Sequence, residues 1–238
     1  MPYFIYMNFV SIKTQFFYFF LNDANITNED IEDVIIASVV PKVMHSFRNS
    51  IRKYLHKEPI IVGPGIKTGI SVQMENPKAV GADRIVDCAG AFYVYGGPAL
   101  IVDFGTATTF DYVDEKGVFS YGVIALGVES GANALWSQTA QLPEVEIKSP
   151  GTILTKTTAT NMQAGLFYGF LGQTEYIIRQ FKKELGRDDI KVIATGGLGK
   201  IIYRHTSLID VYDRDLTFKG LKVIYDRYKE AQREHSSR

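Results

Sequence analysis

The sequence predicts a mixed α/β fold in which buried strands alternate with amphipathic helices. Short apolar runs of strand length recur along the chain, two of them end in glycine turns, and longer stretches with helical periodicity separate them. The chain has 238 residues, of which 46% are apolar and 22% are charged. It can therefore bury a substantial core, as one large domain or as two small ones.

The expected elements of the first part of the chain follow from apolar spacing and turn residues. Pro41 suits the first turn of a helix, and apolar residues recur at helical spacing after it. In order, we expect a helix at Ser11–Leu21, a buried strand at Val34–Val40, a helix at Pro41–Tyr54, a strand at Ile60–Val62 and a helix at Gly81–Tyr95.

A hinge is expected at Gly96-Gly97-Pro98, since two glycines and a proline separate a helix from a buried strand. It divides the chain into an N-terminal domain, residues 1–96, and a C-terminal domain, residues 97–238. Beyond it, the polar loop Asp114–Gly117 predicts a β-hairpin. The expected elements are strands at Ala99–Asp103, Thr108–Val113, Val118–Ala125 and Lys191–Ala194, and helices at Ser130–Gln141, Thr158–Glu184 and Asp215–Glu234.

Gly165, Gly169 and Gly172 fall on one face of the helix expected at Thr158–Glu184. Each glycine costs about 1 kcal/mol of helix stability relative to alanine. Close contact with another helix would explain them, and a dimer interface is one place for that contact.

The composition narrows the classes of partner and location. Lys plus Arg number 26, as do Asp plus Glu, so no global field draws the chain to nucleic acid or to an anionic membrane. Cys88 is the only cysteine, which excludes an intramolecular disulfide and favours a reducing, cytoplasmic location. Met1–Leu21 lacks a basic leader and carries polar residues within its apolar run, which argues against a signal peptide or a membrane anchor.

The strand at Ala99–Asp103 ends in a candidate phosphate-binding turn. Gly105 permits a tight turn, whose backbone amides could bind phosphate oxygens together with the hydroxyls of Thr106, Thr108 and Thr109. A conventional β-hairpin is the alternative, because threonine suits strands in any case. A second strand ends in the same way at Val192–Gly197, and the pair of turns is more informative than either turn alone.

Gly81, Ala82, Asp83 and Arg84 form a second candidate site at the start of a helix. Arg84 could pair with a substrate carboxylate through two hydrogen bonds. Asp83 could accept the proton of a substrate alcohol that attacks the γ-phosphorus of ATP. The alternative is a helix N-terminal Asp in a surface salt bridge.

These motifs resemble those of type III pantothenate kinases in order and spacing. The resemblance runs from about Ser11 to Tyr228 and implies two RNase H-like, actin-like ATPase domains with mixed sheets. The matching segments are Asn76–Arg84, Val102–Thr109, Ala140–Glu146, Ala194–Gly197 and Asp215–Leu221.

The resemblance implies ATP-dependent phosphorylation of pantothenate to 4'-phosphopantothenate, the first step of coenzyme A biosynthesis. It implies ATP with magnesium, a monovalent cation such as potassium or ammonium, and a homodimer. By position, Asp83 resembles the general base, and Gly81–Arg84 with Thr158 the pantothenate contacts. Asp103 resembles the cation ligand, and Gly105 and Thr106 resemble ATP contacts.

The chain also departs from the family pattern. The family's first strand and Asp-x-Gly-Asn-Thr loop have no counterpart, since no glycine precedes Gly63, and the first domain is expected to be truncated. Met74 stands where a substrate-contacting tyrosine is expected, and Tyr121 and Leu126 replace a glycine and a proline. A catalytically impaired relative that acts as a ligand-binding or interaction protein is therefore the alternative function, and a misplaced start of the chain is a third explanation.

Overall fold

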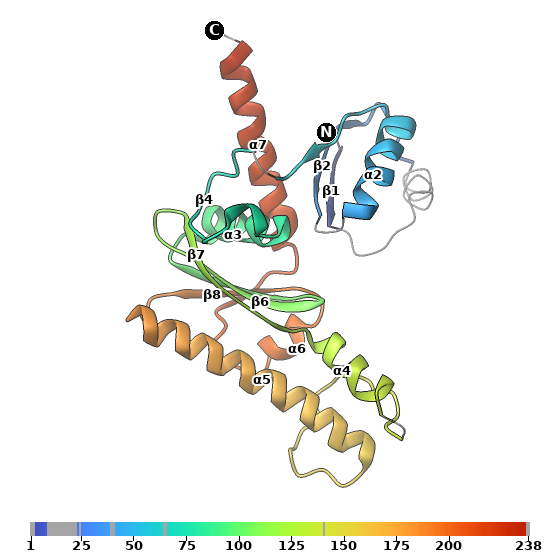
Figure 1. The fold of residues 1–238 in the computed structure, drawn as a ribbon, viewed down its shortest axis with the longest axis vertical. Helices are drawn as coiled ribbons and strands as arrows, with labels where there is room; N and C mark the ends of the chain where they lie inside the picture. The colour runs from blue at the N-terminus through green and yellow to red at the C-terminus, as the bar shows by residue number, and fades with distance from the viewer. Residues whose placement is uncertain are drawn as a thin grey trace. The chain divides into compact units, whose positions relative to one another are not determined.

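The computed structural model describes residues 3–8, 23, 25–38, 41–63, 66–139 and 141–236. The helix expected at Ser11–Leu21 lies outside the described residues. The chain divides into two compact units, one formed by Met1–Val94 with Thr217–Arg238 and the other by Tyr95–Leu216 (Figure 1). Both parallel and antiparallel strand pairs occur, so the predicted mixed α/β class is confirmed. The first unit includes C-terminal residues that the expected boundary after Gly96 assigned to the second domain, and that domain assignment stays a prediction.

The first unit contains a parallel sheet with the strand order β1-β2-β3. The strands are β1 (Tyr3–Asn8), β2 (Ile31–Ala37) and β3 (Ile60–Ile61). Alternate residues of β2 face two different sets of apolar side chains, Val34 and Ile36 on one side and Ile35 and Ala37 on the other. This double burial explains why the second part of β2, Val34–Ala37, is a continuous apolar run.

The strand β1 corrects the sequence-based interpretation, which assigned no element to the first ten residues. It pairs in parallel with β2, from Tyr3 beside Ile31 to Asn8 beside Ala37. Its sequence is rich in aromatic residues, which favour strands, and the pairing satisfies backbone groups along β2. A strand therefore occupies the edge of this sheet. Truncation of the first domain stays a prediction.

Helices cover the two faces of β2. Phe47, Ile51 and Leu55 pack against one face, while residues of α3 and α7 pack against the other. Gly220 brings α7 close to α3, because a Cβ atom at this position would lie 2.1 Å from the Val86 carbonyl oxygen. The elements are α2 (Pro41–Ser50), a π-helical turn (Ile51–Leu55), β4 (Ser71–Val72), a 3-10 turn (Pro77–Ala79), α3 (Ala82–Tyr95) and α7 (Leu216–Ser236).

The second unit contains a mixed sheet in which neighbouring strands follow the order β7-β6-β5-β8-β9. The hairpin strands β6 and β7 run antiparallel, as predicted, whereas β5, β8 and β9 run parallel to one another. The strands are β5 (Ala99–Phe104), β6 (Ala107–Val113), β7 (Val118–Leu126), β8 (Lys191–Thr195) and β9 (Val211–Tyr212).

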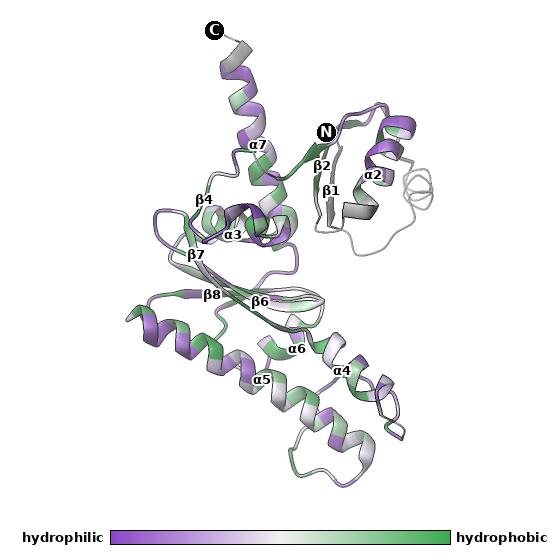
Figure 2. Cartoon of the chain, viewed as in Figure 1, coloured by the Kyte–Doolittle hydropathy of each residue, from purple (hydrophilic) through white to green (hydrophobic). Residues whose placement is uncertain are grey.

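The core of the second unit lies between this sheet and its helices. Buried residues of β5 and β6 pack with Ile178 of α5 and Ile202 of α6. Figure 2 shows polar and apolar residues alternating along α5 and α7, as amphipathic helices require. In the described part of the chain, no helix combines the length and the hydropathy needed to span a bilayer. The helices are α4 (Val128–Ser137), α5 (Thr158–Leu185) and α6 (Gly199–Tyr203).

The glycine face of α5 does not make the expected close contact with any of the described residues. Cβ atoms at Gly165, Gly169 and Gly172 would meet no atom of the described residues within 4 Å. All three glycines are exposed, because the opposite side of α5 packs on the sheet. Contact of this face with another molecule stays a prediction.

Candidate active site

Both predicted glycine turns follow strands that are parallel neighbours in the second unit. Asp103 of β5 lies beside Thr195 of β8, so the two turns start from the same edge of the sheet. A Cβ atom on Gly105 would lie 3.3 Å from Asp103 Oδ2, and one on Gly196 would lie 2.6 Å from Asp103 Oδ1. The Asp103 carboxylate therefore lies between the two turns.

The three threonines after Gly105 differ in position. Thr106 is exposed in the turn, and Thr109 is the cross-strand partner of Asp103 on the same face of the sheet. Thr108 pairs with Phe104 on the opposite, helix-covered face, where it is only 1% exposed. The hydroxyl of Thr108 is therefore not available to a ligand at the turn, which corrects the expectation that it contacts phosphate.

The segment that enters α4 supports the Thr106 turn. A Cβ atom on Gly127 would lie 2.1 Å from the Thr106 carbonyl oxygen, so this segment passes directly against the turn. The Ser130 hydroxyl donates a hydrogen bond of 2.7 Å to the same oxygen. We did not expect Gly127 or Ser130 from the sequence, where a glycine before a helix was the only signal.

Residues 81–84 in the first unit adopt the expected helix start. The amide of Ile85 donates to the Gly81 carbonyl oxygen at 3.3 Å, so the first helical hydrogen bond begins at Gly81. Asp83 lies in the first turn of α3, where the helix dipole stabilises a negative charge. Its Oδ1 accepts a hydrogen bond of 2.8 Å from the backbone amide of Arg84.

Arg84 borders a cavity of about 520 Å³ in the first unit. The cavity joins two features that the sequence singled out separately, Arg84 and Met74, which occupies the position expected for a substrate-contacting tyrosine. A guanidinium at this border can receive a carboxylate ligand. The remaining lining residues are Glu75, Asn76, Ala79 and Val80.

Thr158 lies in the second unit as the first residue of α5. The preceding Thr157 caps the helix by accepting a hydrogen bond from the Thr160 amide at 3.2 Å. Thr158 borders an open, largely apolar cavity of about 610 Å³ together with Asn161, Gly165 and neighbouring residues. A substrate contact by Thr158 stays a prediction.

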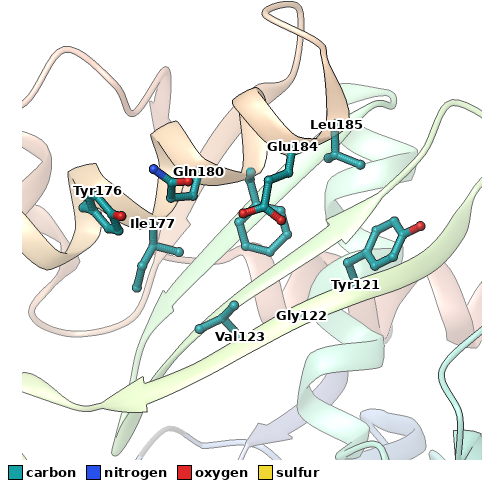
Figure 3. A pocket seen from close by; sticks show the side chains of 9 residues that line it. Tyr121, Gly122, Val123, Tyr176, Ile177, Gln180, Glu184 and Leu185 are labelled. Atoms are coloured by element: carbon teal, nitrogen blue, oxygen red, sulfur yellow. The ribbon is translucent and has the colours of Figure 1, made fainter.

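A further cavity, of about 460 Å³, lies between β7 and the C-terminal half of α5. Figure 3 shows Tyr121 and Val123 on the strand and Ile177, Gln180 and Glu184 on the helix. None of the predicted catalytic or binding residues borders it. Among the described residues that line it, Glu184 is the only charged one, whereas a kinase site needs several groups that bind phosphate. We therefore do not assign the active site to this cavity.

The described residues include no cluster of three or more His, Cys, Asp or Glu side chains that could hold a metal ion. Asp103 nevertheless contributes carboxylate oxygens next to peptide carbonyls, since the Phe104 carbonyl oxygen also lies against Gly196. Carboxylate and carbonyl oxygens are the ligands that hard cations prefer. These oxygens are of the chemical type that hard cations prefer, and binding of a cation at Asp103 stays a prediction.

The fold and the turns place the chain among mixed α/β proteins that carry glycine turns at the ends of parallel strands. Residues 11–180 match a family model described as type III pantothenate kinase. The chain is 60% identical over 208 residues to a type III pantothenate kinase of Bifidobacterium longum (strain DJO10A), with coverage of 87% of this chain and 81% of the relative. The chain belongs to the type III pantothenate kinase family.

Two further proteins are similar to this chain. A type III pantothenate kinase of Agathobacter rectalis is 56% identical over 197 residues, which cover 83% of this chain and 76% of the relative. A crystal structure of a conserved Baf family protein from Campylobacter jejuni superposes with a TM-score of 0.57 at 18% identity, covering 83% of this chain and 84% of that one. The second comparison supports the fold alone.

Proposed function

We propose that this protein phosphorylates pantothenate with ATP and yields 4'-phosphopantothenate, the first step of coenzyme A biosynthesis. The observation that carries the proposal is the 60% identity to a type III pantothenate kinase over 87% of the chain. The adjacent glycine turns support the proposal, because backbone amides in such turns can bind phosphate oxygens. The alternative of a non-catalytic binding protein is not favoured by this degree of identity.

The second unit is proposed to bind the nucleotide. Backbone amides of the turns at Gly105–Thr106 and Gly196–Gly197 can donate to phosphate oxygens, and the exposed Thr106 hydroxyl can add a further donor. Asp103 would hold the monovalent cation, potassium or ammonium, which neutralises phosphate charge when it is bound. Magnesium would arrive with ATP, as in other phosphoryl transfer enzymes.

The first unit is proposed to supply the substrate site. Arg84 would pair with the pantothenate carboxylate at the border of the 520 Å³ cavity, while Gly81 and Ala82 allow close approach of the substrate to the helix start. Asp83 would accept the proton of the pantothenate hydroxyl as its oxygen bonds to the γ-phosphorus of ATP. The bond between that phosphorus and the leaving oxygen of ADP breaks in the same step.

The finer architecture and the assembly are proposals as well. We assign the two units to RNase H-like domains of the actin-like ATPase type, the first of them truncated, in a cytoplasmic protein without nucleic-acid or membrane partners. A homodimer is supported by the exposed glycine face of α5, which no atom of the described residues covers. Thr158 begins the same helix, so an interface that extended to the first turn of α5 would include it.

Release of ADP from ATP, with pantothenate, magnesium and potassium present, tests the proposed function. We expect turnover that depends on pantothenate. The Asp83→Asn variant should lose about 10²- to 10⁴-fold in kcat, the usual contribution of a general base. Its melting temperature should fall by no more than a few degrees, because the variant loses only the charge that the helix dipole stabilises. Absence of turnover in well-folded protein would contradict the kinase assignment and favour the non-catalytic alternative.

A further inference from the structure

Tyr212 contacts the Gly196–Gly197 turn from the neighbouring strand β9. Its hydroxyl donates a hydrogen bond of 2.9 Å to the Gly196 carbonyl oxygen. Its ring lies against the far end of the same turn, because a Cβ atom on Gly199 would be 3.0 Å from Tyr212 Cε2. A single side chain therefore contacts both ends of the segment from Gly196 to Gly199.

The position of Tyr212 is itself fixed by the sheet. Tyr212 pairs in parallel with Ala194 of β8, and the amide of the next residue, Asp213, donates to the Ala194 carbonyl oxygen at 2.8 Å. The buried Asp213 carboxylate accepts a hydrogen bond of 2.7 Å from the Tyr95 hydroxyl. The Tyr212 ring also stacks on Tyr203, with ring centroids 6.0 Å apart. Tyr212 is thus held by the sheet and by the Tyr203 ring, whereas the turn that it contacts lies outside the sheet.

The hydrogen bond to Gly196 determines where the next amide points. In a trans peptide the carbonyl group and the following N–H point in opposite directions. The Gly196 carbonyl is directed to Tyr212 and also accepts from the Gly199 amide at 3.3 Å, so the Gly197 N–H is directed away from both. Burial raises the pKa of the Tyr212 phenol, which keeps the hydroxyl protonated and able to donate.

We propose that Tyr212 is a positioning residue for the nucleotide, which holds the Gly196–Gly197 turn so that the Gly197 amide is presented to a phosphate oxygen. Tyr212 acts through the turn and does not touch the substrate. The inference rests on the proposed function, because the phosphate it concerns is that of ATP.

The variants Tyr212→Phe and Tyr203→Phe test this role. Tyr212→Phe removes one hydroxyl and keeps the ring that packs against Gly199. Tyr203→Phe makes the same chemical change in the other ring of the stack. Within the described part of the chain, the Tyr203 hydroxyl makes no hydrogen bond to the turn. For both variants and the wild type, we would measure the dissociation constant of magnesium-ATP by calorimetry and the KM values for ATP and pantothenate.

We expect Tyr212→Phe to weaken ATP binding and raise the KM for ATP by about three- to ten-fold, the range for loss of one hydrogen bond. The KM for pantothenate should not change, and amide hydrogen exchange at residues 196–199 should become faster. Tyr203→Phe should resemble the wild type. Equal ATP affinity in Tyr212→Phe and wild type would overturn the positioning role alone. Equal changes in both KM values would also overturn it, whereas a wild type that does not bind ATP would overturn the proposed function and this role together.

Discussion

The Asp103 carboxylate lies directly against Gly196, with Asp103 Oδ1 only 2.6 Å from the place of a Cβ atom on that glycine. Gly196 also has a φ of +88°, a conformation that residues with a side chain rarely adopt. Glycine is therefore required at this position for two reasons, the backbone conformation and the close approach of Asp103. Because Asp103 is the next-to-last residue of β5 and Gly196 follows β8, this contact joins the two proposed nucleotide-binding turns.

Gly196→Ala should disturb both turns. The new methyl group would meet Asp103 and the Phe104 carbonyl, and the backbone would be strained, so we expect a loss of about 2 kcal/mol or more in the free energy of unfolding. Gly197→Ala is the matched control for stability, because a Cβ atom there would meet nothing within 4 Å. Urea unfolding compares the two variants, and equal stabilities would contradict the proposed requirement for glycine at position 196.

Ser130→Ala should loosen the Thr106 turn. The variant leaves the Thr106 carbonyl without the hydroxyl that now donates to it at 2.7 Å, which should cost about 1 kcal/mol of stability. Since Thr106 is a proposed ATP contact, the KM for ATP should rise while the KM for pantothenate stays constant. Ser137→Ala, at the exposed end of the same helix, is the control and should resemble the wild type. Parallel increases in both KM values would argue against a local effect at the nucleotide turn.

Much of the fold could be predicted from local sequence. The helix from Thr158 and the hairpin around Asp114–Gly117 were predicted to within two residues, since helical periodicity and a polar turn between apolar runs are local signals. The close approach of α7 to α3 was not predicted. It depends on Gly220 meeting the Val86 backbone, a pair of positions far apart in the sequence.

The candidate site was predicted as separate motifs, and the structure adds how some of them meet. That Asp103 lies between two glycine turns follows from the parallel pairing of β5 with β8, which no local pattern specifies. Thr108 was misassigned because its side chain points to the opposite face from Thr109, and the exact start of a strand decides which face each residue takes. Tyr212 and Ser130 were missed because both donate hydrogen bonds to backbone carbonyl oxygens. Every residue has such a carbonyl, so the sequence does not show which one a hydroxyl will meet.

Gly220→Ala should separate α7 from α3. A Cβ atom at this position would lie 2.1 Å from the Val86 carbonyl oxygen, so the helices must move apart and expose buried neighbours such as Leu221. We expect a loss of about 1–3 kcal/mol in the free energy of unfolding, typical of overpacking. Glu230→Ala, at an exposed position of α7, should change stability by less than about 0.5 kcal/mol. A Gly220→Ala variant as stable as Glu230→Ala would show that the helices do not approach as described.

The contact of α7 with β2 should make stability depend on alkaline pH. Lys229 donates a hydrogen bond of 2.8 Å to Asp33, which raises the pKa of the Lys229 amine. The pKa of the Tyr225 phenol is raised mainly by burial and also by the hydrogen bond of 2.8 Å that it donates to Asp33. The folded protein therefore holds both protons more tightly than the unfolded chain, whose pKa values are about 10. The stabilisation is complete below about pH 10 and is lost as the pH rises through the folded-state values.

Urea unfolding between about pH 7 and pH 11 should thus show a decline in the free energy of unfolding above about pH 10. The double variant Tyr225→Phe, Lys229→Met removes both groups and should make that decline shallower. The same slope in the variant and in the wild type would contradict a role for this cluster in the pH dependence.

Gly169→Leu should convert the proposed homodimer to a monomer. Gly169 lies in the middle of the exposed glycine face of α5, where a Cβ atom would meet no atom of the described residues within 4 Å. In an isolated chain leucine would be tolerated there and would favour the helix by about 1 kcal/mol over glycine. Where a partner helix approaches the backbone at this face, the same side chain would hold the two molecules apart.

An isolated chain and a dimer formed through this face therefore predict opposite effects of Gly169→Leu on stability. If the dimer forms through this face, sedimentation velocity should show a dimer for the wild type and a monomer for Gly169→Leu, and the variant should be no more stable than the wild type. Glu230→Leu places the same side chain on an exposed position of α7 and should leave the dimer intact. A wild type that sediments as a monomer, or a Gly169→Leu variant that remains dimeric, would contradict an interface at the glycine face. The three glycines would then have no structural reason, since alanine at each position would give a more stable helix.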